Sequence, residues 1–204
     1  CRPGNSSGIK VKVAEADFPT RFGPFRIYGF QSGPSDNEQA VAVKMGDLTG
    51  PPPLVRIHSQ CLTGDVFHSL RCDCRSQLEL AMEMIAEEGR GMVIYEKKEG
   101  RGIGLLNKLR AYELQDQGAD TVEANNQLGF EADLRDYELP GAILRYFEVT
   151  GVRLLSNNPE KIQALVQAGI PVTERIPCQP TGDAQANRYL HTKKNKLGHL
   201  LDGF

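Results

Sequence analysis

The sequence predicts a single mixed α/β domain with a strand-rich N-terminal part and a C-terminal β-α-β unit. The chain has 204 residues, of which 40% are hydrophobic and 25% charged, as in one ordinary globular domain. Its N-terminal part consists of short segments that alternate in polarity. Further along, segments with helical spacing alternate with short apolar runs, which favours a sheet flanked by helices.

The strands of the N-terminal part are separated by turn residues. The stretch 11–28 is predicted to form short strands around Pro19 and Gly23-Pro24. Residues 40–48 and 54–58 also alternate like strands, on either side of a run of three prolines. Before them, residues 1–10 are rich in Gly, Ser and Asn. We expect 1–10 to be a flexible segment and 11–204 to be one folded domain.

Two helices and one strand are expected in the middle of the chain. Residues 77–88 carry apolar side chains at helical spacing, and Gly89 stands where a helix would stop. The short apolar run 92–95 has the length of a strand, and a second helix is predicted over 105–117.

The C-terminal part predicts a strand, a helix and a second strand. The strands cover 152–155 and 170–176, and the helix between them starts at Asn158-Pro159 and reaches Ala168. We interpret this order as a β-α-β unit. Residues 177–187 are expected to form a mobile loop.

Composition argues against several classes of partner. The formal net charge is -2 without a long run of like charge, so nucleic-acid binding through phosphate neutralisation is not expected. No run of about 18 apolar residues suggests a membrane span, and the N-terminus lacks the layout of a signal peptide. We therefore expect a cytoplasmic protein, without a nucleic-acid or membrane partner, that binds a small molecule.

Three of the five cysteines, Cys61, Cys72 and Cys74, cluster in a C-x10-C-x-C arrangement. Thiolates are strong zinc ligands, and three protein ligands with an open fourth position are typical of a catalytic zinc. A structural zinc would need a fourth ligand, which His58 or His68 could supply. Spacing alone leaves both interpretations open, and three unconnected thiols are the remaining one.

Other polar features have both a functional and a plain interpretation. The loop Glu99-Gly-Arg-Gly-Ile-Gly104 follows a predicted strand and precedes a helix, where backbone amides and an arginine can face a phosphate. A glycine-rich turn of this spacing can also be only a turn. By composition alone, Asp133 and Arg135 would belong to a solvated face, and Tyr112 to a core or groove.

Four segments together resemble successive signatures of GTP cyclohydrolase II. They are His58-Ser-Gln-Cys-Leu-Thr-Gly-Asp65, Arg71-Cys-Asp-Cys74, Glu99-Gly-Arg-Gly-Ile-Gly-Leu-Leu-Asn-Lys108 and Asp120-Thr-Val-Glu-Ala-Asn125. The resemblance runs in one order from about residue 11 to about residue 201 without large gaps.

The resemblance implies a ring-opening reaction. By similarity Cys61, Cys72 and Cys74 bind a catalytic Zn2+ whose water attacks C8 of guanine, and C8 leaves as formate. Tyr112 matches a tyrosine that assists these steps. Mg2+ would accompany the triphosphate, held mostly by phosphate oxygens and waters.

The resemblance also implies chemistry at the α-phosphate. Asp133 and Arg135 match the proposed base and nucleophile for its cleavage. An arginine nucleophile needs a nearby carboxylate because its pKa is high, so stabilisation of the phosphoryl transition state by Arg135 is the alternative. The remaining implied residues surround the nucleotide: Arg56, Ile57, His58, Ser59, Gln60, Gln77, Glu99, Gly100, Arg101, Thr121, Ser156 and Lys161.

Four positions depart from the pattern of that family. Gln60, Arg75, Ser76 and Lys98 stand where Glu, Gly, an aromatic residue and Gln are expected. They could tune affinity, product or metal exchange. None of them removes an expected metal ligand or catalytic residue.

The resemblance implies hydrolysis of GTP to 2,5-diamino-6-(5-phospho-ribosylamino)pyrimidin-4(3H)-one, formate and pyrophosphate, the first step of riboflavin biosynthesis. It also implies a homodimer, and a dihydroxybutanone phosphate synthase domain fused upstream in a longer parent polypeptide. Two alternatives remain: a paralogue that stops at the formamidopyrimidine, and a non-catalytic zinc module that binds nucleotide as a regulator.

Overall fold

The computed structural model describes residues 12–33, 39–130 and 138–179 of the chain. Within these residues a seven-stranded mixed sheet has the order β1-β2-β3-β5-β4-β6-β7. Neighbouring strands from β1 to β5 in that order pair antiparallel, and β5, β4, β6 and β7 pair parallel. The strands are β1 (Lys12–Thr20), β2 (Gly23–Gln31), β3 (Gln39–Met45), β4 (Leu54–Ser59), β5 (Gly91–Glu96), β6 (Val152–Leu155) and β7 (Val172–Ile176).

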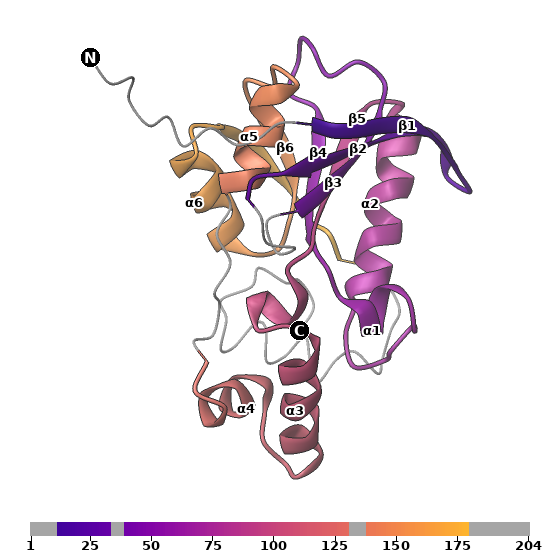
Figure 1. The fold of residues 1–204 in the computed structure, drawn as a ribbon. Coiled ribbons are helices and arrows are strands. Elements are labelled where there is room, and N and C mark those ends of the chain that lie inside the picture. Colours follow the sequence, from indigo (N-terminus) through magenta and orange to yellow (C-terminus); the bar gives the residue numbers. More distant parts are fainter. Residues whose placement is uncertain (1–11, 34–38, 131–137, 180–204) are drawn as a thin grey trace.

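Helices cover both faces of the sheet. Helix α2 (Cys74–Glu88) lies on one face, and α5 (Glu138–Tyr146) and α6 (Pro159–Gln167) lie on the other (Figure 1). Each side has its own hydrophobic core. One contains Ala81, Met82 and Ile85 of α2, and the other contains side chains of α5 and α6.

A second group of helical segments lies toward one end of the sheet. It consists of α1 (Leu62–Asp65), the 3-10 turn η2 (Glu99–Gly102), α3 (Leu105–Asp116) and α4 (Thr121–Gln127). Helices α3 and α4 are next to each other beyond the sheet (Figure 1).

Successive side chains of the central strand β4 point to opposite faces of the sheet. Val55 and Ile57 of β4 pack in the core with α5 and α6, whereas Leu54 packs in the core with α2. Arg56 and His58 alternate with Val55 and Ile57, so they project on the α2 side, yet they are only 5% and 2% exposed. The central strand β4 therefore carries two polar side chains that are buried.

The predicted fold class is confirmed: the chain has a mixed α/β sheet with a strand-rich N-terminal part. The β6-α6-β7 unit is parallel, as a β-α-β unit requires. Asn158 caps α6 by accepting a hydrogen bond from the Glu160 amide at 3.0 Å. Gly89 ends α2 in the left-handed conformation with φ 68°.

Some elements differ from the sequence prediction. Helix α2 begins at Cys74 and not at residue 77, because its first turn carries polar side chains that conceal the helical period. Helices α1, α4 and α5 were not predicted. The expected flexible segment 1–10, most of the expected loop 177–187, and the site residues Asp133 and Arg135 lie outside the described residues.

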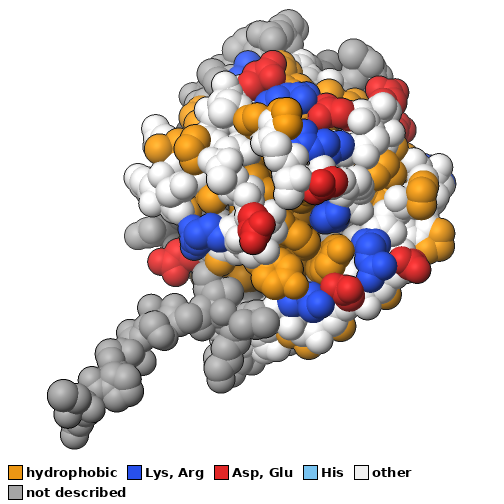
Figure 2. All heavy atoms as spheres, turned by 90° about the horizontal axis from the view of Figure 1, so that it is seen from above, with side chains coloured by type: hydrophobic (Ala, Val, Ile, Leu, Met, Phe, Trp, Pro, Cys, Tyr) orange, Lys and Arg blue, Asp and Glu red, His pale blue; other side chains and the backbone are white. Residues whose placement is uncertain are grey.

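Acidic and basic side chains are interspersed on the end of the molecule opposite α3 and α4 (Figure 2). On the edge ribbon β1–β2, Arg26 pairs with Glu15 at 2.9 Å and with Asp17 at 3.1 Å. Such cross-strand pairs suit an edge strand that is exposed along most of its length.

In the described part of the chain, no helix combines the length and apolar character that a membrane crossing requires.

The sheet tolerates no side chain at Gly91, where β5 starts. A Cβ atom there would lie 2.6 Å from the Leu54 carbonyl oxygen and 2.9 Å from Ile85 Cγ1. We expect Gly91→Ala to lower the free energy of unfolding by about 1–3 kcal/mol in urea denaturation. Gly29→Ala is the control, because its Cβ would meet nothing closer than the Ala14 oxygen at 4.0 Å. Equal stability of the two variants would contradict the close approach.

Candidate active site

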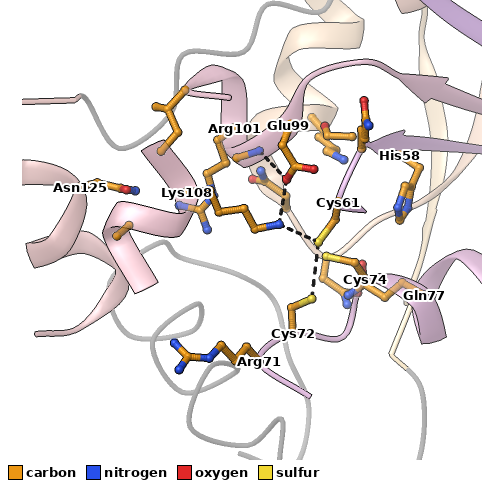
Figure 3. Close-up of a pocket in the computed structure, with 18 of the residues that line it drawn as sticks. His58, Cys61, Arg71, Cys72, Cys74, Gln77, Glu99, Arg101, Lys108 and Asn125 are labelled. Atoms are coloured by element: carbon orange, nitrogen blue, oxygen red, sulfur yellow. Dashed lines mark hydrogen bonds and ion pairs between the residues drawn. The ribbon is translucent and has the colours of Figure 1, made fainter. Parts of the chain in front are cut away.

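The described residues form a pocket at the carboxyl ends of the parallel strands. Residues that follow β4, β5 and β6 line it, together with side chains from α2, α3 and α4. Carboxyl ends of parallel strands meet at one edge of a sheet, which is the usual place for a binding site in α/β proteins. Figure 3 shows this pocket.

Three thiols converge on one wall of the pocket. Cys61 precedes α1, Cys74 is the first residue of α2, and Cys72 lies between the two helices. All three Sγ atoms lie within 4.8 Å of one another, and Cys61 and Cys72 are 3.6 Å apart. Hydrogen bonds from Cys72 and Cys74, together with the nearby Lys108 ammonium, lower the pKa of Cys61.

This geometry fits a metal ion bound by three sulfurs. Zn–S bonds of about 2.3 Å in tetrahedral geometry separate two sulfurs by about 3.8 Å, close to the spacing found here. Gly64 provides the necessary room, since a Cβ there would lie 2.7 Å from Cys72 Sγ and 3.1 Å from Cys61 Sγ. Among the described residues, the group that could hold a metal ion contains three cysteines and no histidine.

A buried carboxylate anchors the first of these cysteines. Asp65 accepts hydrogen bonds from the Cys61 amide at 3.0 Å and from the Tyr95 hydroxyl at 2.7 Å, and it faces His58 Nε2 at 3.2 Å. Burial lowers the pKa of His58, and its ring stacks on Tyr95. Asp65 thus joins β4, β5 and the start of α1.

A second carboxylate joins the glycine-rich loop to the thiols. Glu99 accepts hydrogen bonds from the amides of Leu62 at 2.6 Å and Gly100 at 3.0 Å. It also accepts from Lys108 Nζ at 2.8 Å, and this ammonium lies 3.1 Å from Cys61 Sγ (Figure 3). Burial alone would lower the pKa of Lys108, but the Glu99 carboxylate and the Cys61 thiolate raise it.

Tyr112 lies on α3 beside the thiols. Its hydroxyl is 3.1 Å from Thr63 Oγ1, and the Arg71 guanidinium stacks 4.7 Å from its ring centre. Arg71 also pairs with Asp116 on α3. Burial raises the pKa of Tyr112, so its hydroxyl stays protonated and can donate a hydrogen bond.

A chain of buried polar side chains runs behind the pocket. Arg56 donates to the Leu155 carbonyl at 2.9 Å and to Gln77 Oε1 at 2.6 Å. Gln77 Nε2 donates in turn to Asp73 at 2.5 Å, and Asp73 stands between two of the cysteines. These contacts fix which end of the Gln77 amide faces each neighbour.

The glycine-rich loop is strained at a residue that is not glycine. Gly100 and Arg101 both have φ 61°, and together they belong to the turn η2. The left-handed region is costly for a residue with a Cβ, and such outliers cluster at functional sites. The loop thereby directs Glu99 toward the thiols while Arg101 lines the pocket.

Most of the residues implied by the resemblance lie in this one pocket. Ile57 is buried in the core, and its carbonyl oxygen accepts a hydrogen bond from Lys161 Nζ at 2.7 Å. Thr121 is the first residue of α4, and its side chain lies outside the described part of the structure. The implied residues that do line it are Arg56, His58, Ser59, Gln60, Cys61, Cys72, Cys74, Gln77, Glu99, Gly100, Arg101, Tyr112, Ser156 and Lys161.

Other lining residues had no assigned role from the sequence. Arg71, Lys108 and Asn125 lie within the four signature segments, yet nothing in their spacing distinguishes them from solvated side chains. A basic residue in the first turn of a helix, as at Lys108, opposes the helix dipole, and this was the one available signal. Asn157 and Asn158 also line the pocket.

The fold and the site define a class of protein: an α/β protein with a pocket at the carboxyl edge of its parallel strands, where three thiols could hold a metal ion. A family model for GTP cyclohydrolase II matches residues 11–177. The chain belongs to the GTP cyclohydrolase II family, which confirms the resemblance and the expectation of an enzyme.

Curated relatives agree along nearly the whole chain. The GTP cyclohydrolase-2 of Teredinibacter turnerae is 52% identical over 192 residues, which are 94% of this chain and 96% of that protein. That of Aeromonas hydrophila is 53% identical, over 93% of this chain and 96% of its own. That of Pseudomonas aeruginosa PAO1 is 55% identical, over 94% of this chain and 93% of its own.

A solved structure also aligns with the chain. It is a two-domain 3,4-dihydroxy-2-butanone 4-phosphate synthase from A. baumannii, with a TM-score of 0.47 and 18% identity. The alignment covers 85% of this chain and 40% of that one.

Gly64→Ala is expected to destroy the metal site while the fold persists. The added methyl group would displace the sulfurs of Cys72 and Cys61, because it would lie 2.7 Å and 3.1 Å from their Sγ atoms. Metal analysis of the purified variant should find little bound zinc, and far-UV circular dichroism should be unchanged. The Gly29→Ala control should keep its metal. A Gly64→Ala protein that binds zinc as tightly as the parent would contradict the steric argument.

The strain at Arg101 gives a prediction of stability. Arg101→Gly and Arg101→Ala both remove the guanidinium, but alanine keeps the left-handed strain. Urea denaturation should find the glycine variant more stable than the alanine variant by about 1 kcal/mol. If the alanine variant is equally stable, the loop does not hold this residue in a strained conformation.

Proposed function

We propose that the chain hydrolyses GTP to 2,5-diamino-6-(5-phospho-ribosylamino)pyrimidin-4(3H)-one, formate and pyrophosphate, as the first step of riboflavin biosynthesis. The observation that carries the proposal is that three thiols, Tyr112 and several cationic side chains line one pocket. Membership of the GTP cyclohydrolase II family supports it.

Cys61, Cys72 and Cys74 would hold zinc in this pocket. Zinc bound by three protein ligands activates water near neutral pH, which supplies the nucleophile for opening a purine ring. Asp65 and Glu99 hold the segment around Cys61 in place, since they accept the amides of Cys61 and Leu62. The chain itself thus fixes the position of the first sulfur.

Tyr112 would serve the ring-opening steps. Its raised pKa keeps a proton on the hydroxyl, which lies on the wall next to the thiols. A neutral hydroxyl can donate to a nitrogen or oxygen of the base as charge develops there. Thr63 and Arg71 orient the ring from two sides.

The triphosphate would meet the cationic part of the pocket. Arg56, Arg101 and Lys161 line it, and Lys161 lies in the first turn of α6. Backbone amides at a helix N-terminus favour an anion. Mg2+ would accompany the triphosphate and would offset part of its negative charge.

Further parts of the proposal rest on the family resemblance. Asp133 and Arg135 would act at the α-phosphate, either as base and nucleophile or with Arg135 as an electrostatic stabiliser. The remaining implied contacts of the nucleotide, Thr121 among them, are proposed on the same ground. We also propose a homodimer, a cytoplasmic location, a catalytic domain over 11–204 and an upstream synthase domain in the parent polypeptide.

The test incubates the purified protein with GTP, Zn2+ and Mg2+ and measures formate, pyrophosphate and product mass. The parent should release both small products, and its pyrimidine product should lack the formyl carbon. A mass that retains the formyl group would instead identify the paralogue that stops at the formamide. Absence of any GTP turnover would favour the regulatory module.

One variant separates ring opening from cleavage at the α-phosphate. Cys61→Ser should abolish formate, and pyrophosphate should still appear with a GMP-like product if cleavage at phosphorus is independent of ring opening.

A second variant tests the role of Arg135 at the α-phosphate. Arg135→Ala should stop pyrophosphate release, and loss of formate alone would refute that role. A nucleophile is worth several powers of ten in rate, whereas one stabilising charge is worth roughly two to three. An Arg135→Ala enzyme that keeps more than about a hundredth of its pyrophosphate release would favour the electrostatic role.

A further inference from the structure

Lys108 occupies a position in the pocket that its own helix disfavours. It is in the first turn of α3, where its amide donates to the N-cap carbonyl of Gly104 at 3.1 Å. A cation in the first turn opposes the helix dipole, and its side chain is only 13% exposed. Burying an ammonium at the unfavourable end of a helix requires compensation from other contacts.

Two negative groups supply that compensation. Lys108 Nζ donates to Glu99 Oε1 at 2.8 Å and to Cys61 Sγ at 3.1 Å, so it bridges a carboxylate and a thiolate (Figure 3). The Glu99 carboxylate is itself held by the amides of Leu62 and Gly100. Because Glu99 is fixed on two sides, the ammonium it binds is fixed as well, pointing at the sulfur.

A hydrogen bond to a sulfur that binds a metal ion changes how strongly that ion attracts electrons. An ammonium that donates to a thiolate withdraws electron density from sulfur, so the sulfur gives less to the ion and the ion stays more electrophilic. It also reduces the repulsion among three thiolates that face one divalent ion. Lys108 exerts both effects through Cys61, whose sulfur accepts its hydrogen bond.

We propose that Lys108 is a positioning residue for the metal centre, whose ammonium, oriented by Glu99, donates to the metal-binding sulfur of Cys61 and keeps the ion electrophilic. This rests on the proposed zinc site at Cys61, Cys72 and Cys74. Lys108 differs from the cations of the triphosphate region, because its partners are a protein carboxylate and a protein thiolate.

The experiment replaces zinc with Co2+ in the full chain and records the sulfur-to-cobalt charge-transfer band. A hydrogen bond stabilises the sulfur electrons, so its removal should move the band to longer wavelength. Lys108→Met removes the donor and keeps most of the side-chain length. Lys108→Arg keeps a charged donor and should restore most of the parental band position. The control is Arg110→Met, which removes an exposed cation from the same helix.

The same proteins are then titrated with Zn2+ against a chelator. Without the ammonium the three thiolates repel one another more strongly, and outer-shell partners of metal ligands typically contribute 10- to 100-fold in metal affinity. Lys108→Met should therefore bind zinc about 10- to 100-fold more weakly. Lys108→Arg should lose less, and Arg110→Met should match the parent. Formate release should fall in Lys108→Met even at saturating zinc.

The outcomes distinguish this proposal from the one on which it rests. If the parent shows no sulfur-to-cobalt band, the three-thiol metal centre itself is wrong. If the parent shows the band but Lys108→Met has the same band and the same zinc affinity, the role of Lys108 is wrong. Should Lys108→Met fail to fold, Lys108→Leu also removes the donor and gives the same comparison, and a band unmoved in that variant would equally overturn the proposal.

Discussion

The described site depends on one place where only a hydrogen atom fits. Three sulfurs from two helix starts and the segment between them converge on Gly64, and any Cβ there would overlap two of them. The packing constraint acts on the segment as a whole, since Gly64 is buried inside the short helix α1. The lack of a side chain at Gly64 therefore lets the sulfurs of Cys61 and Cys72 lie close to the backbone of α1.

Two acidic side chains complete that arrangement from opposite sides. Asp65 ties the start of α1 to β4 and β5, and Glu99 ties it to the glycine-rich loop and α3. Buried carboxylates are stable only when hydrogen bonds satisfy them, and both have at least three partners. The loop strain at Arg101 is the local cost of bringing Glu99 inward.

Much of this organisation could be predicted from the sequence, but not all of it. The spacing of Cys61, Cys72 and Cys74 predicted that the three thiols lie together, whereas the glycine-rich loop left an anion site and a plain turn both open. Contacts between residues far apart in sequence, such as Lys108 with Cys61, depend on how α3 packs and have no local pattern. Helix α5 escaped prediction because it contains Pro140 and Gly141, which usually break a helix. Pro140 is tolerated because it lies in the first turn, where backbone amides have no helical partner.

The rim of the pocket also depends on a residue that lies just after β7, the last strand in the described part of the chain. The side-chain amide of Asn157 donates to the Cys178 carbonyl at 2.8 Å and accepts from the Cys178 amide at 3.0 Å. This pair of hydrogen bonds resembles the pairing of two strands, and it continues the contact between β6 and β7 past the ends of both strands. The segment 156–158 lines the pocket, and hydrogen bonds thus hold it to Cys178. The match to the family model ends one residue earlier, at 177. A truncation at that boundary would free one wall of the pocket while sparing every lining side chain.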